Sequence, residues 1–257
     1  MKIEKMNMSL SEFSALAKTQ FSEEQRSRDL GHESFFGVSF DQAVEYFEKG
    51  YISNTDKMLL DIDSLVSLAR ESFADEYQFD VTGEFFDIGR VVSGEPEVWL
   101  YRPIEEKPEL DLIIDFGYNC NIKQDQIYNR GVAVLSFIRL ASEKFNLRIE
   151  LANKVLPMRD SALSSSMTFS FIIPNDPLDL DLMNYLLTHK GAFRRLGISV
   201  LENLSGIENV SSETTATELS ETRENSIYFP LIKRDEYKTL EESKERVVKL
   251  LQDKLGA

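Results

Sequence analysis

The chain has 257 residues, of which 42% are hydrophobic and 11% aromatic, and its formal net charge is -15. Apolar residues are spread along most of the chain, which excludes collagen, coiled-coil and wholly disordered classes. No run approaches the roughly 18 apolar residues that a membrane span needs. The lone Cys120 has no second cysteine to pair with, and residues 1–13 lack the apolar stretch of a signal peptide. We therefore expect a cytoplasmic protein with no membrane partner.

Charge is distributed unevenly along the chain. Residues 1–116 carry 25 acidic and 11 basic residues, whereas residues 117–200 carry 7 acidic and 10 basic residues. Residues 201–257 are acidic again, with 12 acids and 8 bases. The middle stretch therefore indicates a local surface that faces anions, although chance clustering on a solvated surface gives the same counts.

The first third of the chain mixes a polar segment with two expected helices. Residues 1–34 are polar and predict a mobile arm. The order Ser39-Phe40-Asp41-Gln42 has capping-box spacing, so we expect a helix that begins there and ends at Gly50. Apolar residues recur at helical spacing over 55–73. Glycine, proline and short apolar pairs over 81–106 predict an irregular region of strands and loops.

The middle of the chain alternates strands and helices. We expect strands at 110–116, 146–156, 167–174 and 197–204, and helices at 124–146 and 179–193. This alternation predicts an α/β core over 35–204 with a partly parallel central sheet flanked by helices. Ligands of such sheets bind beyond the carboxyl ends of the strands.

Two segments follow the expected core. Residues 205–226 are polar and predict a flexible linker. Residues 227–257 predict a C-terminal amphipathic helix with a narrow apolar stripe. The helix packs either on the core or on a partner, and we expect it to bind a partner or to form a homo-oligomer. On this view, a chain that lacks 227–257 keeps a folded core.

Residues suited to catalysis are few. The two histidines are His32, in the polar arm, and His189, which we expect at a helix end facing the helix dipole. Cys120 is better explained as a thiol in a loop than as a nucleophile. The run Ser164–Ser166 lacks the G-x-S-x-G turn of a nucleophilic serine. Phosphate-loop, dinucleotide and H-E-x-x-H motifs are absent from the sequence. We expect a protein that is not an enzyme and has no cofactor.

The strand expected at 110–116 ends near Asp115, and a polar loop and a long helix follow. This order is similar to the beginning of von Willebrand A-type domains, whose metal site uses an Asp-x-Ser-x-Ser loop because hydroxyl and carboxylate oxygens suit hard cations. Here the loop reads Asp115-Phe116-Gly117-Tyr118-Asn119. Both hydroxyl positions are replaced, so we expect a degenerate A-type or a novel topology with no bound metal.

Aromatic and basic residues gather at the predicted loop ends. Rings can stack on unpaired bases while cations contact phosphates, so this mixture predicts a site for single-stranded DNA. Helix capping, surface charge and core packing explain any one of these residues equally well. The predicted site consists of Tyr118, Lys123, Tyr128, Arg130, Lys154, Arg159, Lys190, Arg194 and Arg195.

Three segments resemble an uncharacterised family of phage and mobile-element proteins. They are 35–51, 81–100 with its Ser-Gly-Glu-Pro-Glu sequence, and Asn129-Arg130-Gly131. The resemblance implies a phage protein in the host cytoplasm, and among such proteins are single-stranded-DNA-binding cofactors of a phage-encoded RNA polymerase. It therefore implies a role in transcription with RNA polymerase subunits as partners. The alternative is a scaffold that contacts only proteins.

At 81–100, an ion pair between Asp87 or Glu95 and an arginine is the structural alternative to a ligand site.

Overall fold

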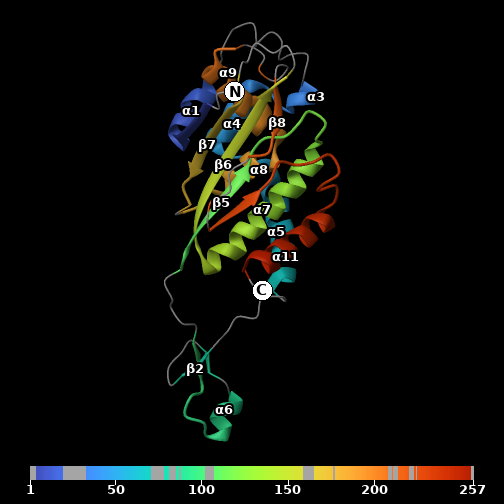
Figure 1. Ribbon diagram of the computed structural model, residues 1–257. Coiled ribbons are helices and arrows are strands. Elements are labelled where there is room, and N and C mark those ends of the chain that lie inside the picture. The colour runs from blue at the N-terminus through green and yellow to red at the C-terminus, as the bar shows by residue number, and fades with distance from the viewer. Residues whose placement is uncertain are drawn as a thin grey trace.

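The computed structural model shows an α/β architecture with two separate sheets (Figure 1). It describes residues 4–19, 33–70, 78–80, 85–86, 88–101, 107–158, 165–175, 177–207, 210, 214–219, 223 and 225–255. The larger sheet has six strands, namely β1 (Glu4–Ser9), β5 (Glu109–Asp115), β6 (Asn146–Pro157), β7 (Met167–Ile173), β8 (Thr214–Thr217) and β9 (Ser226–Phe229). The mixed α/β class expected from the sequence is therefore confirmed.

The larger sheet is mostly parallel. Its strand order is β1-β7-β6-β5-β9, and β8 pairs with the C-terminal end of β6, at residues 154–157. The pairs β1–β7, β5–β6 and β5–β9 are parallel, whereas β6 pairs antiparallel with both β7 and β8. Asp115 lies at the carboxyl end of β5, which is a central strand of this sheet.

Helices precede, connect and follow the strands of this sheet. The described helices outside the smaller sheet are α1 (Leu10–Lys18), α3 (Glu33–Phe36), α4 (Phe40–Lys49), α5 (Thr55–Arg70), α7 (Gln124–Lys144), α8 (Leu180–Thr188), α9 (Ile198–Ser205) and α11 (Leu240–Leu255). A 3-10 turn, η1 (Ile52–Asn54), precedes α5, and a π-helical turn, η2 (Ala192–Gly197), precedes α9. The expected capping box of α4 is present, because Ser39 and Gln42 each accept a hydrogen bond from the other's backbone N–H at 3.2 Å.

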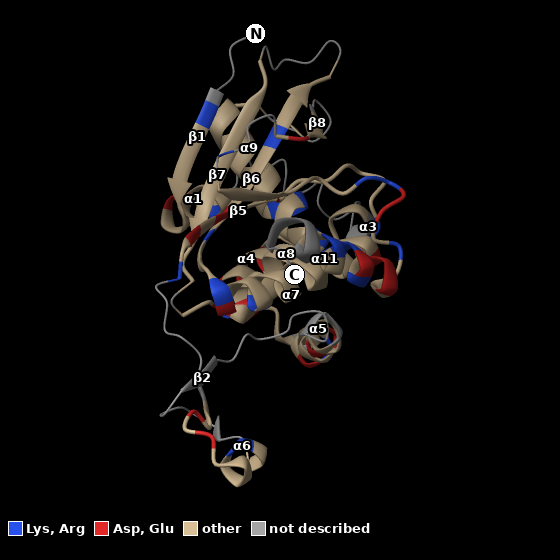
Figure 2. Cartoon of the chain, turned by 60° about the horizontal axis from the view of Figure 1, so that its bottom comes forward, with Lys and Arg blue, Asp and Glu red and all other residues tan. Residues whose placement is uncertain are grey.

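Helices at both ends of the sheet pack on the same sheet face. One row of neighbouring side chains crosses four strands and consists of Phe171, Leu151, Ile114 and Phe229. At one end, Phe13 of α1 stacks on Phe171, with ring centroids 3.9 Å apart. At the other end, Phe137 of α7 meets Phe229 edge-on at 5.3 Å. Figure 2 shows α1 and α9 behind β1, β7 and β6 accordingly.

The opposite sheet face carries polar and charged residues. Arg223 bridges two strands, because its guanidinium lies 2.7 Å from the carboxylate of Glu150 on β6 and 3.3 Å from that of Asp111 on β5. Towards the β1 edge, Ser170 donates a hydrogen bond of 2.9 Å to the side chain of Asn7. These side chains alternate along each strand with the apolar row that faces the helices, as the two-residue period of a strand requires.

The smaller sheet is formed by the region expected to be irregular. Its strands are β2 (Gln78–Asp80), β3 (Phe85–Phe86) and β4 (Trp99–Tyr101), in the order β2-β4-β3, and the short helix α6 (Ile88–Ser93) lies between β3 and β4. We call the described residues of 78–101 the small lobe. Residues 88–99, the part of the lobe whose side-chain burial the structure describes, contribute nothing to the buried apolar core.

Four expectations from the sequence are wrong. The expected strand at 197–204 is helix α9, whose Ile198, Val200 and Leu201 are all buried. The expected mobile arm 1–34 contains β1 and α1, although residues 20–32 lie outside the described part. The expected linker 205–226 contributes β8 to the sheet, and 227–257 contributes most of β9. Helix α11 packs against α7 with Ser243 and Val247 buried, so it belongs to the core.

None of the described helices combines the length and apolar character needed to cross a bilayer.

Deleting residues 227–257 should unfold the protein rather than leave a folded core. The deletion removes the buried side chains of Ile227, Phe229, Leu231, Ile232, Tyr237 and Val247. Burying one large apolar side chain contributes about 1.5–3 kcal/mol, so the loss is comparable with a typical total stability of about 5–15 kcal/mol. We expect no cooperative melting transition when ellipticity at 222 nm is followed on heating (the wavelength of the helix signal). A cooperative transition in the truncated chain would contradict this assignment of β9 and α11 to the core.

Candidate functional site

The carboxyl end of β5 holds a fully buried carboxyl group. Asp115 has no exposed surface. One of its oxygens accepts a hydrogen bond of 3.0 Å from the backbone N–H of Gly117, and the other accepts one of 3.2 Å from the hydroxyl of Tyr228 on β9. Burial raises the pKa of Asp115 to about 7, although these hydrogen bonds and the charge of Arg130 oppose the shift. The group links the ends of β5 and β9.

Gly117 allows β5 and β6 to approach closely just beyond Asp115. A Cβ atom at Gly117 would lie 1.9 Å from the amide nitrogen of Asn153, so a larger residue does not fit. Asn153 is fully buried, and neither its amide nitrogen nor its amide oxygen has a hydrogen-bond partner among the residues that the structure describes. In the part of the chain that the structure describes, no group of three His, Cys, Asp or Glu side chains is arranged to hold a metal ion. The loop thus packs tightly against β6 through Gly117, the residue that stands at one of the two lost hydroxyl positions.

Arg194 lies in the interior and binds backbone carbonyl groups. It is only 4% exposed. Its guanidinium donates hydrogen bonds to the carbonyls of Phe35 (2.7 Å), Ile122 (2.9 Å), Cys120 (3.1 Å) and Asn119 (3.2 Å). It therefore ties the loop after β5 to α3.

Two further predicted phosphate ligands have the same role. Arg195 is buried, donates a hydrogen bond of 2.8 Å to the carbonyl of Val38, and lies 3.6 Å from the ring centroid of Phe36. Arg130 is also buried and donates to the carbonyls of Phe229 (3.2 Å) and Pro230 (2.9 Å). The expectation that Arg130, Arg194 and Arg195 contact phosphates is corrected, because their donors face the protein's own carbonyl groups.

The two tyrosines of the predicted site are also buried. Tyr118 donates its hydroxyl to the carbonyl of Lys190, and its ring meets Phe193 edge-on at 5.2 Å. Tyr128 on α7 donates a hydrogen bond of 2.7 Å to Asp61 on α5. Neither ring presents a face on which a base could stack, so the stacking role is corrected as well.

The lysines of the predicted site remain closer to the surface. Lys123 is exposed at the start of α7, and Lys190 is half-buried at the end of α8. Gln124, the residue after Lys123, joins the start of α7 to the segment after α8, because its side chain donates to the carbonyl of Thr188 (2.6 Å) and accepts from the backbone N–H of Lys190 (3.0 Å). Burial and the nearby Arg194 charge lower the pKa of Lys190. Lys154 is half-buried near the end of β6, and Arg159 lies outside the described residues.

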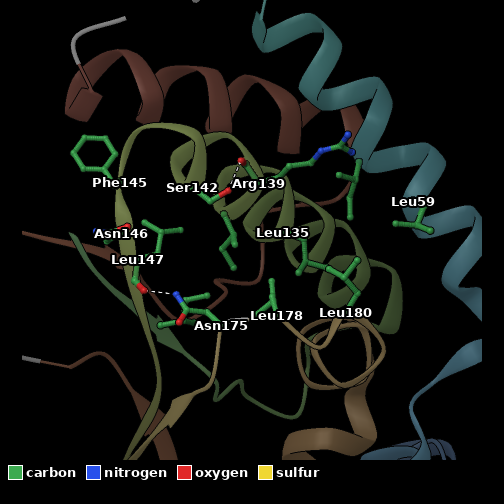
Figure 3. A pocket seen from close by; sticks show the side chains of 13 residues that line it. Leu59, Leu135, Arg139, Ser142, Phe145, Asn146, Leu147, Asn175, Leu178 and Leu180 are labelled. Atoms are coloured by element: carbon green, nitrogen blue, oxygen red, sulfur yellow. Dashed lines mark hydrogen bonds between the residues drawn. The ribbon is translucent and has the colours of Figure 1, made fainter. Parts of the chain in front are cut away.

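A second candidate site is an apolar groove at the opposite end of β6 (Figure 3). We call it the α5–α7 groove, and its volume is about 600 Å³. Its lining residues come from α5, α7, the start of β6 and the segment before α8, and they are Leu59, Ile62, Leu135, Ile138, Arg139, Ser142, Phe145, Asn146, Leu147, Ile149, Asn175, Leu178 and Leu180. Leu180, at the first position of α8, is 44% exposed. Sequence reasoning missed this groove because its apolar residues follow ordinary core periodicity.

A third candidate is the exposed helix of the small lobe. Ile88, Val91 and Val92 of α6 are 67%, 49% and 82% exposed. Arg90 and Glu95 form an ion pair across the turn that follows, where Gly94 has a φ of +72°. The ion pair considered from the sequence is therefore present, although its side chains are partly exposed rather than buried.

The sequence comparison now places the chain. A family model described as a domain of unknown function, DUF7192, matches residues 3–255. The chain belongs to the DUF7192 family. No curated protein and no solved structure matches it. The A-type topology and the phage resemblance therefore stay predictions for this DUF7192 chain.

The buried carboxyl group of Asp115 should make stability depend on pH. Its folded-state pKa, about 7, lies above the ordinary value of 3.8, so the folded state binds this proton more tightly than the unfolded state. Its contribution is fully present at low pH and is lost as pH rises from about 4 to about 7, by about 1.4 kcal/mol per pKa unit. We therefore compare the free energies of unfolding of Asp115→Asn and the wild type, measured with urea. The value for Asp115→Asn should increase relative to that of the wild type as pH rises through this range.

The control for this prediction is Asp56→Asn, which changes an exposed carboxylate in the first turn of α5. It should follow the wild type across the same pH range. Equal pH dependence in the wild type and in Asp115→Asn would show that Asp115 ionises normally in the folded protein.

Proposed function

We propose that this chain is a non-enzymatic scaffold that binds another protein through α6 of the small lobe. The observation that carries the proposal is the exposure of Ile88, Val91 and Val92 on one short helix. Exposed apolar patches on otherwise polar surfaces are typical of protein interaction sites. The helix is held in place by local contacts, because Ser93 donates a hydrogen bond of 2.9 Å to the carbonyl of Gly89.

The charge near α6 favours a partner with a basic rim around an apolar centre. Glu97 is exposed in the turn after the helix, where Glu95 is paired with Arg90. Complementary charge steers association and orients the partner. Such a rim would attract the lobe while its apolar centre covers Val92.

The environments of the reactive side chains support a binding role over catalysis. Burial lowers the pKa of His189 to about 4, and its Nδ1 accepts a hydrogen bond of 3.0 Å from the backbone N–H of Gly191. The ring also packs beside Tyr51 and Tyr185. A histidine in this setting is neutral at physiological pH and is therefore a poor general acid, and its Nδ1 is already used by a backbone donor.

Site-specific photo-crosslinking tests the scaffold proposal. A benzoylphenylalanine introduced at Val92 should give one discrete protein adduct in cells that express the chain, and adding Val91→Asp should abolish it. The matched control places the same group at Ile52, which is 69% exposed outside the lobe and should give no such adduct. An absent Val92 adduct, or the same adduct from both positions, would reject α6 as the docking element.

A second candidate function is binding of single-stranded DNA at the carboxyl end of β5. The observation that favours it is the link that Gln124 makes between the segment that carries exposed Lys123 and the segment that carries half-buried Lys190. The role as a cofactor of a phage-encoded RNA polymerase would join both functions, with the polymerase as the protein that α6 binds.

Salt-dependent binding of a fluorescent single-stranded oligonucleotide separates the two candidates. For the scaffold, we expect no binding at low salt. For a DNA-binding protein, the logarithm of affinity should fall by about 0.7 per neutralised phosphate for each decade of salt. In that case Lys123→Ala with Lys190→Ala should flatten the slope, whereas Lys49→Ala, an exposed lysine on α4, should leave it unchanged.

A further inference from the structure

We propose that the α5–α7 groove binds α6 from a second copy of this chain, so that two chains form a reciprocal dimer. The inference rests on the proposed function, since it uses the same exposed side chains of α6. It specifies one partner, which is the chain itself.

The groove is suited to an apolar occupant. Figure 3 shows Leu135 of α7, Leu147 of β6, and Leu178 facing a common space. Its volume of about 600 Å³ lies within the range of roughly 300–1,000 Å³ that is usual for binding pockets. Three aliphatic side chains from one turn of helix would supply the matching surface.

Several polar groups of the groove are already satisfied within the chain. Asn175 donates its side-chain amide to the carbonyl of Leu147. Asn146 donates a hydrogen bond of 3.0 Å to the carbonyl of Lys107, and the ammonium of Lys107 donates one of 2.7 Å to the carbonyl of Ser142. A polar ligand would therefore have to compete with these internal bonds, whereas an apolar one would not.

Charge at the groove complements the turn that follows α6. Arg139 lines the groove but is already paired with Asp63 of α5, whereas Lys107 gives its hydrogen bond to a neutral carbonyl rather than to a carboxylate. The turn after α6 exposes Glu97. A docked α6 would bring this carboxylate towards Lys107, whose acceptor Ser142 lines the groove, and this charge attraction orients the contact.

Every copy of the chain carries both surfaces. When α6 of one copy occupies the groove of another, the free α6 and the free groove of the same pair can make the same contact in return. Such a two-fold arrangement closes on itself and doubles the buried area relative to a single contact. Closure also explains why exposed aliphatic residues on α6 need not lead to open-ended association.

Sedimentation velocity of the full-length chain tests the dimer. We expect concentration-dependent dimerisation of the wild type. Val92→Asp should weaken it about tenfold or more, because the docked carboxylate would be buried against apolar side chains. Leu180→Asp should do the same from the groove side, and an acidic residue is tolerated in the first turn of α8. Ile52→Asp, which changes a residue that is 69% exposed but lies on neither surface, should match the wild type.

Mixing the two impaired variants gives the decisive result. Val92→Asp keeps an intact groove and Leu180→Asp keeps an intact α6, so the mixture should form heterodimers through one contact although each variant alone is impaired. The reciprocal dimer is overturned if the wild type is monomeric, or if the mixture dimerises no more strongly than either variant alone. The proposed scaffold function would survive that outcome if the Val92 adduct contains a different protein, and it fails separately if no adduct forms.

Discussion

The structure depends on one packing constraint. Helices α1 and α7, at opposite ends of the six-stranded sheet, pack on the same face of it. Phe13 at one end and Phe137 at the other contact the same row of side chains. The opposite face carries a polar cluster, in which Arg223 links two strands through Asp111 and Glu150. Ion pairs of this kind satisfy charges that partial burial would otherwise penalise.

The same packing explains why the basic middle of the chain does not form a basic surface. Segments that cross the carboxyl ends of the strands leave backbone carbonyl groups that need donors. Arg194 supplies donors to four carbonyls, and Arg130 and Arg195 satisfy three more between them. A planar guanidinium with several donors suits this role better than an ammonium group does. Net charge counted along the sequence therefore overstated the anion-binding potential.

The sequence predicted the centre of the fold well because each signal there was local. The continuous apolar run at 110–116 corresponds to β5, and the helix expected at 124–146 is α7. The capping signal at Ser39 fixed the start of α4. Each of these rests on periodicity or capping within one element, so no knowledge of tertiary contacts was required.

The errors have a common cause, which is that tertiary contacts decided them. Residues 198–201 are buried on every side, so their apolar run lacked the one-sided pattern of a surface helix and resembled a strand. Strand β1 is polar along most of its length and is ordered by parallel pairing with β7, which the sequence of 4–9 does not reveal. The candidate site changed for the same reason. Whether an arginine faces a phosphate or a carbonyl depends on residues more than seventy positions away, as with Arg194 and Ile122. Exposure of Val92 is likewise a tertiary property, and only once the core is assigned does an apolar α6 outside it become a reason to expect a partner.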